Sequence, residues 1–260
     1  MQTITSIKNS KSKIPLVMIT AYDALFAKLF DKKVDIILVG DSLNMSFNAQ
    51  PDTLSATLDI MIYHTKAVCA GAKDTFVVCD MPFGTYTDEK MALANATRVY
   101  SETNAHAIKI EGGSDRAYII KALTSNSIAV MGHIGLMPQF VRSEGGYKIR
   151  GKNEDDIKQL LLDAKAVEDA GAFCLVIEGV KEEVAKEISR SVSIPTIGIG
   201  SGVYTDGQVL VWSDAFGLFS DFKPKFVKQY LDGTKLVENA LENYINDVRT
   251  RVFPSVEHTY

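Results

Sequence analysis

The feature that most constrains the fold of this 260-residue chain is a set of eight short apolar runs spread along its length. Most of them carry β-branched residues, and each has Gly, Pro or Asp at or near its end, which favours strands over helices. Their near-continuous apolar character is typical of strands covered on both faces, as in parallel sheets. The runs span residues 14–23, 34–41, 75–82, 105–113, 127–136, 172–180, 193–202 and 209–217.

The segments between these runs have the periodicity of amphipathic helices. Residues 155–171, for example, place Ile157, Leu160 and Ala164 on one helical stripe before Gly171 ends the pattern. Eight strands separated by helices in about 250 residues predict a (β/α)8 barrel, the TIM-barrel class of α/β proteins. A doubly wound open sheet is the rival architecture.

We expect a single barrel domain over residues 1–260, because no Pro- or Ser-rich linker divides the chain. Two connections, residues 44–58 and 137–156, are long and largely polar, and long loops of this kind are often functional. Beyond Asp221 the apolar periodicity predicts a C-terminal helical extension suited to subunit packing.

Composition and charge exclude several functional classes. The formal net charge of −4 and the pI near 5.6 leave no basic footprint for nucleic acid. The N-terminus lacks the apolar core of a signal peptide, and no apolar run approaches the roughly 18 residues that a membrane helix needs. Cys69, Cys79 and Cys174 form neither a CxxC pair nor an even disulfide set, which fits a reducing compartment. We therefore expect a cytoplasmic protein with no nucleic-acid or membrane partner.

Four of the apolar runs carry a carboxylate at or near the end of their apolar stretch: Asp41, Asp80, Glu111 and Glu178. In a barrel the active site lies where the C-terminal ends of the strands meet, so such carboxylates face a shared pocket. Consecutive strands are usually neighbours and lie about 4.8 Å apart. That spacing lets Asp41 and Asp80 reach one cation together.

The fourth strand adds an argument from side-chain alternation. Lys109 and Glu111 are two residues apart and so emerge on one side of the strand, whereas Ile108 and Ile110 take the other. Charged side chains facing the packed helices would be costly to bury. The mouth of the barrel is therefore the expected place for Lys109 and Glu111.

Each of these residues also has a purely structural explanation. Asp41 with Ser42 could cap the next helix, and Asp80 could begin a turn. Lys109 and Glu111 could pair with each other, and the acid of the sixth strand could belong to a loop. We favour a site, because capping does not explain why acids recur one residue inside the strand end.

The donor types indicate which chemistry such a site supports. Two Asp ligands without clustered His or Cys suit Mg²⁺ rather than Zn²⁺. An α-keto acid can chelate the ion through its 2-oxo and carboxylate oxygens, and the ion then stabilises the enolate formed when the adjacent carbon loses a proton. Lys109 would offset the substrate charge, and an uncoordinated Glu would act as base. His133 could donate to the substrate or be an ordinary buried histidine.

Eight motifs then place the chain beside a known family. They are VGDSLNM, DMPFGTY, KIEGG, GHIGLMPQ, YKIRGK, IPTIGIGSG, DGQVLVWSDAFG and VFPSVEHTY, and they cover nearly the whole chain. In this order they resemble the ketopantoate (3-methyl-2-oxobutanoate) hydroxymethyltransferases of pantothenate biosynthesis. The resemblance implies a (β/α)8 barrel of the phosphoenolpyruvate/pyruvate type. It also implies Mg²⁺ and transfer of a hydroxymethyl group from 5,10-methylenetetrahydrofolate to 3-methyl-2-oxobutanoate, giving 2-dehydropantoate.

The resemblance also assigns roles by motif. Asp41 and Asp80 would bind the metal and lie close to the keto acid, and Glu111 would belong to the metal site. Ser42 and Lys109 would hold the keto acid. The proton acceptor would be Glu178, in VIEGV. Family members commonly assemble as decamers, which implies a homo-oligomer here.

The chain departs from the usual family pattern at Asn44, Ser201 and Ser213, where Gly, Ala and His are frequent. None of the three is a proposed metal ligand or base, so the departures concern loop conformation and contacts to the folate. Two other hypotheses stay open. A lyase acting on keto acids would keep the metal–enolate site without folate, whereas a non-catalytic barrel would have no need of the charged residues together.

Overall fold

The computed structural model describes residues 2–218 and 224–260. The chain divides into two compact units, residues 1–211 and residues 212–260. Asp221, the start of the predicted helical extension, lies outside the described residues.

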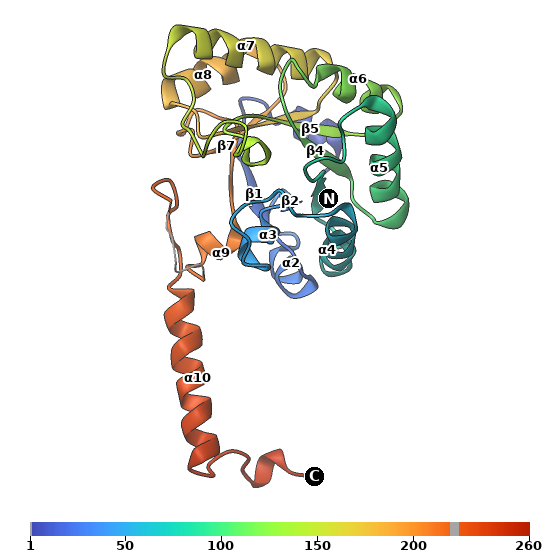
Figure 1. The fold of residues 1–260 in the computed structure, drawn as a ribbon. Coiled ribbons are helices and arrows are strands. Elements are labelled where there is room, and N and C mark those ends of the chain that lie inside the picture. The colour runs from blue at the N-terminus through green and yellow to red at the C-terminus, as the bar shows by residue number, and fades with distance from the viewer. Residues whose placement is uncertain (1, 219–223) are drawn as a thin grey trace. The chain divides into compact units, whose positions relative to one another are not determined.

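The first unit is a closed barrel of eight parallel strands in chain order, in which β8 pairs with β1. This confirms the (β/α)8 barrel and excludes the open sheet. Figure 1 shows the strands surrounded by helices. The strands are β1 (Leu16–Thr20), β2 (Ile36–Val39), β3 (Phe76–Asp80), β4 (Ala107–Glu111), β5 (Val130–Gly135), β6 (Cys174–Glu178), β7 (Thr196–Ile199) and β8 (Gly207–Leu210).

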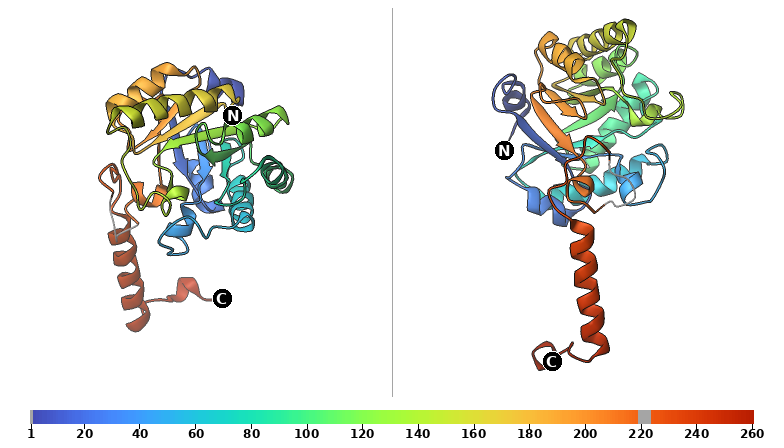
Figure 2. Two further views of the ribbon diagram at one scale, coloured as in Figure 1. Left: turned by 45° about the horizontal axis from the view of Figure 1, so that its top comes forward. Right: turned by 90° about the vertical axis from the view of Figure 1, so that its left-hand side faces the viewer.

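Helices follow most strands and pack on the outside of the barrel, as Figure 2 shows from two further sides. Several begin at a side-chain cap; Asp23, Asp88 and Asn153, for example, accept hydrogen bonds from backbone N–H groups of the first turn. The predicted helix at residues 155–171 is confirmed as α7. The helices are α1 (Ile4–Lys8), α2 (Ala24–Phe30), α3 (Leu43–Ser46), α4 (Leu58–Gly71), α5 (Glu89–Glu102), α6 (Ala117–Ser125), η1 (Pro138–Phe140), α7 (Glu154–Asp169) and α8 (Glu182–Ser191).

The eighth strand differs from the prediction. The apolar run at residues 209–217 overlaps β8 by two residues, and most of the remainder forms the short helix α9 (Trp212–Ala215). The strand starts earlier, at Gly207, where a Cβ atom would lie 2.5 Å from the carbonyl oxygen of Leu16. Only glycine permits this approach to β1, so a residue that resembles a turn in sequence begins a strand. Residues 200–206, all of them described, connect β7 to β8 without the helix that strict alternation predicts.

The second unit holds α9, α10 (Gly233–Arg249) and the 3-10 helix η2 (Val256–His258). Asp232 caps α10 by accepting a hydrogen bond from the backbone N–H of Lys235 at 3.4 Å. The apolar periodicity beyond residue 221 therefore predicted a helix correctly.

The interior of the barrel changes from apolar to charged along the strands. One layer of inward side chains belongs to the hydrophobic core: Val78, Ala107, Met131 and Val176. Two positions further along the same strands, on the same side by alternation, come Asp80, Lys109, His133 and Glu178. The charged residues thus form the uppermost interior layer, at the C-terminal ends of the strands.

Candidate active site

Three neighbouring strands bring the charged residues into register. Asp80 of β3 is paired with Lys109 of β4, and Glu111 with His133 of β5. The Nζ atom of Lys109 lies 2.7 Å from Asp80 Oδ1 and 3.7 Å from Glu111 Oε1, and all three side chains are buried. The prediction that Lys109 and Glu111 share the inner face is confirmed. Lys109 does pair with Glu111, but its closer partner is Asp80.

His133 links this cluster to Glu178 at the end of β6. Its Nε2 atom lies 3.3 Å from Glu178 Oε2, and its Nδ1 atom lies 3.5 Å from Glu111 Oε1. Lys109 Nζ is also 3.1 Å from Nδ1, a contact that favours the neutral ring because an ammonium group only donates. Burial and Lys109 lower the pKa of His133, but the two carboxylates outweigh them and raise it to about 9. We regard the carboxylates as the stronger influence, because two negative charges close to a buried ring favour its charged form.

Glu178 is the most accessible acid of the group, with 18% of its side chain exposed, whereas Asp80 and Glu111 are almost fully enclosed. Glu178 can therefore meet a substrate in the mouth of the barrel. His133 is buried and hydrogen-bonded, as the ordinary explanation holds, and it also contacts the acid proposed as base.

Asp41 and Ser42 lie just beyond the end of β2, from which Gly40 separates them. The backbone N–H of Asp41 donates to Asp80 Oδ2 at 3.2 Å, which ties the two predicted metal ligands together. Ser42 immediately precedes α3, all of whose residues the structure describes. Its hydroxyl makes no hydrogen bond to a backbone N–H of that helix. Instead it lies 2.7 Å from the hydroxyl of Tyr22. The capping explanation for Ser42 is therefore wrong.

Gln139, in η1, is a residue that sequence reasoning missed. Its Nε2 atom donates to Asp41 Oδ2 and to the carbonyl of Met81, both at 2.9 Å, and its backbone N–H donates to Glu111 Oε2 at 3.0 Å. Its Oε1 atom accepts from the hydroxyl of Tyr86 at 2.5 Å. The only signal in the sequence was the position of Gln139 at the end of the motif GHIGLMPQ.

Gly135 allows the chain to reach this position. It has a φ of +100°, and a Cβ atom there would lie 2.2 Å from the carbonyl oxygen of Glu178. The chain therefore turns sharply out of β5 beside β6, and Leu136 N–H donates to that carbonyl at 2.7 Å. This turn sends the following residues back over the mouth of the barrel.

Burial and neighbouring charges set the protonation of the cluster. Burial raises the pKa of Asp41 well above its usual range, and the carboxylates of Asp80 and Glu111 raise it further. Burial also raises the pKa of Asp80, against the pull of Lys109. Burial disfavours the charged form of Lys109, but its carboxylate neighbours raise its pKa overall, so it is an ammonium at neutral pH. Burial would raise the pKa of Glu111 too, yet Lys109 and His133 lower it.

The donor set fits a hard divalent cation. Within the part of the chain that the structure describes, no three His, Cys, Asp or Glu side chains converge into a metal cage. Mg²⁺ seldom uses such a cage, because it takes one or two carboxylates and completes its shell with water and substrate oxygens. Asp41 and Asp80 suit this pattern, since a cation between them would relieve the repulsion that raises the pKa of Asp41. Glu111, like Asp80, contacts Lys109, and it also accepts a hydrogen bond from the backbone N–H of Gln139, so it belongs to the same cluster.

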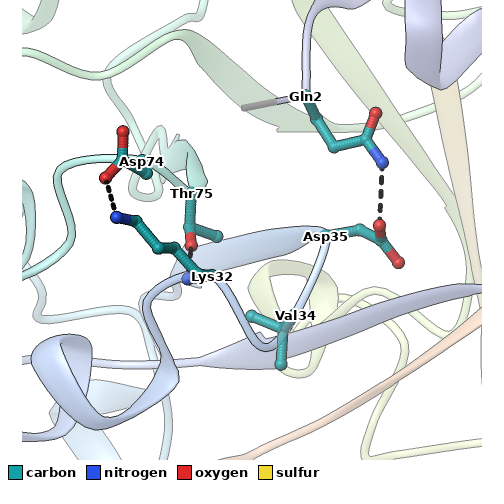
Figure 3. Close-up of a pocket in the computed structure, with 6 residues that line it drawn as sticks. All are labelled: Gln2, Lys32, Val34, Asp35, Asp74 and Thr75. Carbon is teal, nitrogen blue, oxygen red and sulfur yellow. Dashed lines mark hydrogen bonds and ion pairs between the residues drawn. The ribbon is translucent and has the colours of Figure 1, made fainter.

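A pocket of about 400 Å³ lies at the opposite end of the strands from the charged cluster, beside the residues that precede β2 and β3. Figure 3 shows that its polar groups are paired with each other. Lys32 Nζ lies 2.9 Å from Asp74 Oδ2, and Gln2 Nε2 donates to Asp35 Oδ1 at 2.8 Å. This pocket therefore does not contribute to the charged cluster.

Fold and site together define a (β/α)8 barrel with its polar centre at the C-terminal ends of the strands, where enzymes of this fold carry their active sites. The family model described as ketopantoate hydroxymethyltransferase matches residues 1–256. The chain belongs to this family of enzymes.

Relatives of high identity support the assignment. Proteins named 3-methyl-2-oxobutanoate hydroxymethyltransferase from Aliarcobacter butzleri and Sulfurimonas denitrificans are 66% and 63% identical to this chain. The alignments cover 99% of the chain in both cases, and 96% and 98% of the relatives. A relative of the same name from Helicobacter pylori is 57% identical over 99% of the chain and 96% of its own length.

Solved structures support the fold alone. A phosphoenolpyruvate phosphomutase from Streptomyces platensis subsp. rosaceus superimposes with a TM-score of 0.67 at 14% identity, covering 100% of this chain and 92% of that one. Phosphonopyruvate hydrolase in complex with oxalate and Mg++ gives 0.64 at 11% identity, covering 99% and 93%.

Two observations concern the surroundings in which the chain works. Its three cysteines, all in described residues, are buried and free. Among the helices that the structure describes, none has both the length and the apolar character needed to traverse a bilayer.

Proposed function

We propose that this chain transfers a hydroxymethyl group from 5,10-methylenetetrahydrofolate to 3-methyl-2-oxobutanoate, giving 2-dehydropantoate, with Mg²⁺ as cofactor and as a step of pantothenate biosynthesis. The family and the names of its relatives support the reaction. One structural observation supports the chemistry: at the C-terminal ends of the strands the interior of the barrel holds a connected set of three carboxylates, one ammonium group and one imidazole. The buried free thiols suit a reducing compartment, and we propose the cytoplasm.

Four residues are suited to hold the keto acid and its metal. Lys109 carries a buried positive charge that would offset the charge of the substrate carboxylate. The hydroxyl of Ser42 would donate a hydrogen bond to the same carboxylate. Asp41 and Asp80 would hold Mg²⁺. When bound, the ion would act as a Lewis acid on the 2-oxo group and make the C3 proton more acidic.

Glu178 is the proposed proton acceptor. It is the accessible acid of the site, and His133 at 3.3 Å would hold its carboxylate in place. Removal of the C3 proton leaves an enolate, and C3 gains a C–C bond to the one-carbon unit, whose two C–N bonds to the folate break. One water molecule supplies the hydroxyl group of the product, and its remaining proton together with the C3 proton taken by Glu178 balances the two nitrogens of the released tetrahydrofolate.

Mass spectrometry tests the reaction directly. The chain, Mg²⁺, 3-methyl-2-oxobutanoate and 5,10-methylenetetrahydrofolate together should yield 2-dehydropantoate, and omission of the folate should abolish it. Consumption of the keto acid at the same rate without folate would overturn the transferase assignment and favour a lyase.

Replacing the base separates proton transfer from binding. We expect Glu178→Gln to slow exchange of the C3 proton with deuterated water by at least about 100-fold, the scale of one general base. Calorimetry should find Mg²⁺ binding in the presence of the keto acid nearly unaltered. Glu183→Gln, which changes an exposed glutamate on α8, is the matched control. Wild-type exchange in Glu178→Gln would remove Glu178 from this role.

A further inference from the structure

A pocket of about 400 Å³ opens beside the charged cluster. Its walls come from the loops that follow β2, β3 and β5, two of which are the long polar connections seen in the sequence. The lining residues are Leu54, Ser55, Phe83, Gln139, Arg142 and Ser143. This volume lies within the range of about 300–1,000 Å³ that small-molecule sites occupy.

One wall residue of the pocket, Gln139, also belongs to the proposed reaction centre. Gln139 donates to Asp41 Oδ2 at 2.9 Å and, through its backbone, to Glu111 Oε2 at 3.0 Å. Phe83 lies three residues beyond Asp80 in the loop after β3. A molecule in this pocket would therefore contact Gln139, the residue that also contacts Asp41 and Glu111.

The lining combines a flat apolar surface with a cation. Phe83 is 53% exposed, so its ring is available to a flat ligand in the pocket. Leu54 extends the apolar wall. Arg142 is at the rim, with 76% of its side chain exposed, and lies 3.1 Å from Asp52.

We infer that this pocket binds the folate co-substrate, with the pterin and aminobenzoyl rings against Phe83 and Leu54 and the glutamate carboxylates near Arg142. The inference rests on the proposed function and adds the residues that hold the carrier. The keto acid itself, with five carbons and no ring, has no use for an aromatic wall. Two further pockets among the described residues are less suitable, because residues that precede strands contribute to their walls, at the end of the barrel remote from the carboxylates.

The aromatic wall is tested through the two Michaelis constants. Stacking on an aromatic ring contributes enough that we expect Phe83→Ala to raise the KM for 5,10-methylenetetrahydrofolate about 10-fold. The KM for 3-methyl-2-oxobutanoate should shift less than two-fold. Tyr204→Ala is the matched control, since Tyr204 is a half-exposed aromatic residue lining a pocket near the start of β8. Phe83→Leu, which keeps an apolar wall, should have an intermediate effect.

The role of Arg142 is tested with a co-substrate that lacks the glutamate of the folate. In the wild type, 5,10-methylenetetrahydropteroate should have a KM about five-fold above that of the complete folate, the scale of one charge-assisted contact at a partly exposed site. Arg142→Gln should abolish this difference, because it should raise the KM for the complete folate and leave the KM for the pteroate unchanged. Arg190→Gln, at the other end of the barrel, should leave the difference intact.

The outcomes distinguish this inference from the reaction itself. A wild-type chain that forms no 2-dehydropantoate contradicts the proposed function. A wild type that forms it, together with Phe83→Ala and Arg142→Gln variants whose folate KM is that of the wild type, overturns the pocket assignment alone. Deuterium exchange at C3, which requires no folate, reports whether the keto-acid site of each variant is intact.

Discussion

Gln139 shows how one side chain can organise several charged groups. Its amide contacts Asp41 and Tyr86, and its backbone N–H contacts Glu111, so a single 3-10 turn fixes two carboxylates. A hydrogen-bond donor of this kind holds a metal-binding carboxylate in its binding orientation before the metal arrives. Less side-chain freedom is then lost when the metal binds. Gln139 is therefore a positioning residue in the proposed site.

We expect Gln139→Leu to weaken Mg²⁺ binding by about 10- to 100-fold, because Asp41 loses the donor that orients it. Isothermal titration with the keto acid present measures this without turnover. Gln159→Leu is the control, since Gln159 also donates to a carboxylate, Asp163 at 2.8 Å, but on the exposed surface of α7. Equal Mg²⁺ affinity in wild type and Gln139→Leu would contradict the positioning role.

Not every residue of the site could be predicted from sequence. Asp80, Lys109 and Glu111 lie on strands, where alternation fixes which side each side chain takes. Gln139 lies in a loop, which has no period, and its contacts depend on the turn at Gly135 and on three distant segments. Roles that depend on long-range contacts therefore stay hidden until the chain is folded.

The same distinction holds for whole elements. Seven strands coincide with apolar runs, because a strand covered on both faces is apolar along most of its length. The eighth was misplaced, because its first residue is a glycine required by close approach to β1 and because the apolar residues that follow belong to α9. Local composition could not separate a short strand from the helix beside it.

At the level of elements, Asp206 joins three segments at the N-terminal end of the barrel. Its carboxylate accepts from the backbone N–H groups of Ser12 and Thr196 and lies 2.8 Å from Lys11 Nζ. The residues involved precede β1, begin β7 and precede β8, so one acid closes the part of the barrel that lacks a helix. Burial raises the pKa of Asp206, but these donors lower it overall.

We expect Asp206→Asn to lower the free energy of unfolding by about 2 kcal/mol at pH 7, the scale of hydrogen bonds to a charged group. The folded-state pKa lies below the ordinary 3.8, so the stabilisation is present above that value and is lost as the pH falls through the folded-state pKa. Urea unfolding of both proteins between pH 7 and pH 3 measures the difference, which should shrink toward pH 3.

The control for this change is Asp169→Asn on α7, whose carboxylate is 63% exposed and lies 2.7 Å from Lys165. Surface ion pairs contribute little, so we expect a change within about 0.5 kcal/mol at pH 7. If Asp206→Asn were as mild as this control, the carboxylate would not hold the three segments together.

On the scale of the whole molecule, the apolar face of α10 bears on assembly. Leu236, Val237, Leu241, Tyr244, Ile245 and Val248 are 36–58% exposed. A contiguous exposed apolar surface of this kind is typical of a protein–protein interface. We expect the chain to form a homo-oligomer, and we expect this face to take part in it.

Light scattering after size exclusion tests this expectation, with a mass that should be a multiple of 28.5 kDa. Replacing both Leu241 and Val248 by Glu should shift the mass to a smaller species, because each buried side chain of this size contributes about 1.5–3 kcal/mol. Glu242→Gln, an exposed change on the same helix, should leave the mass as it is. Circular dichroism should find the helix content preserved in the double variant, so that lost assembly is not mistaken for unfolding. A wild-type mass of one chain would refute the oligomer, and a double variant of wild-type mass would place the interface elsewhere.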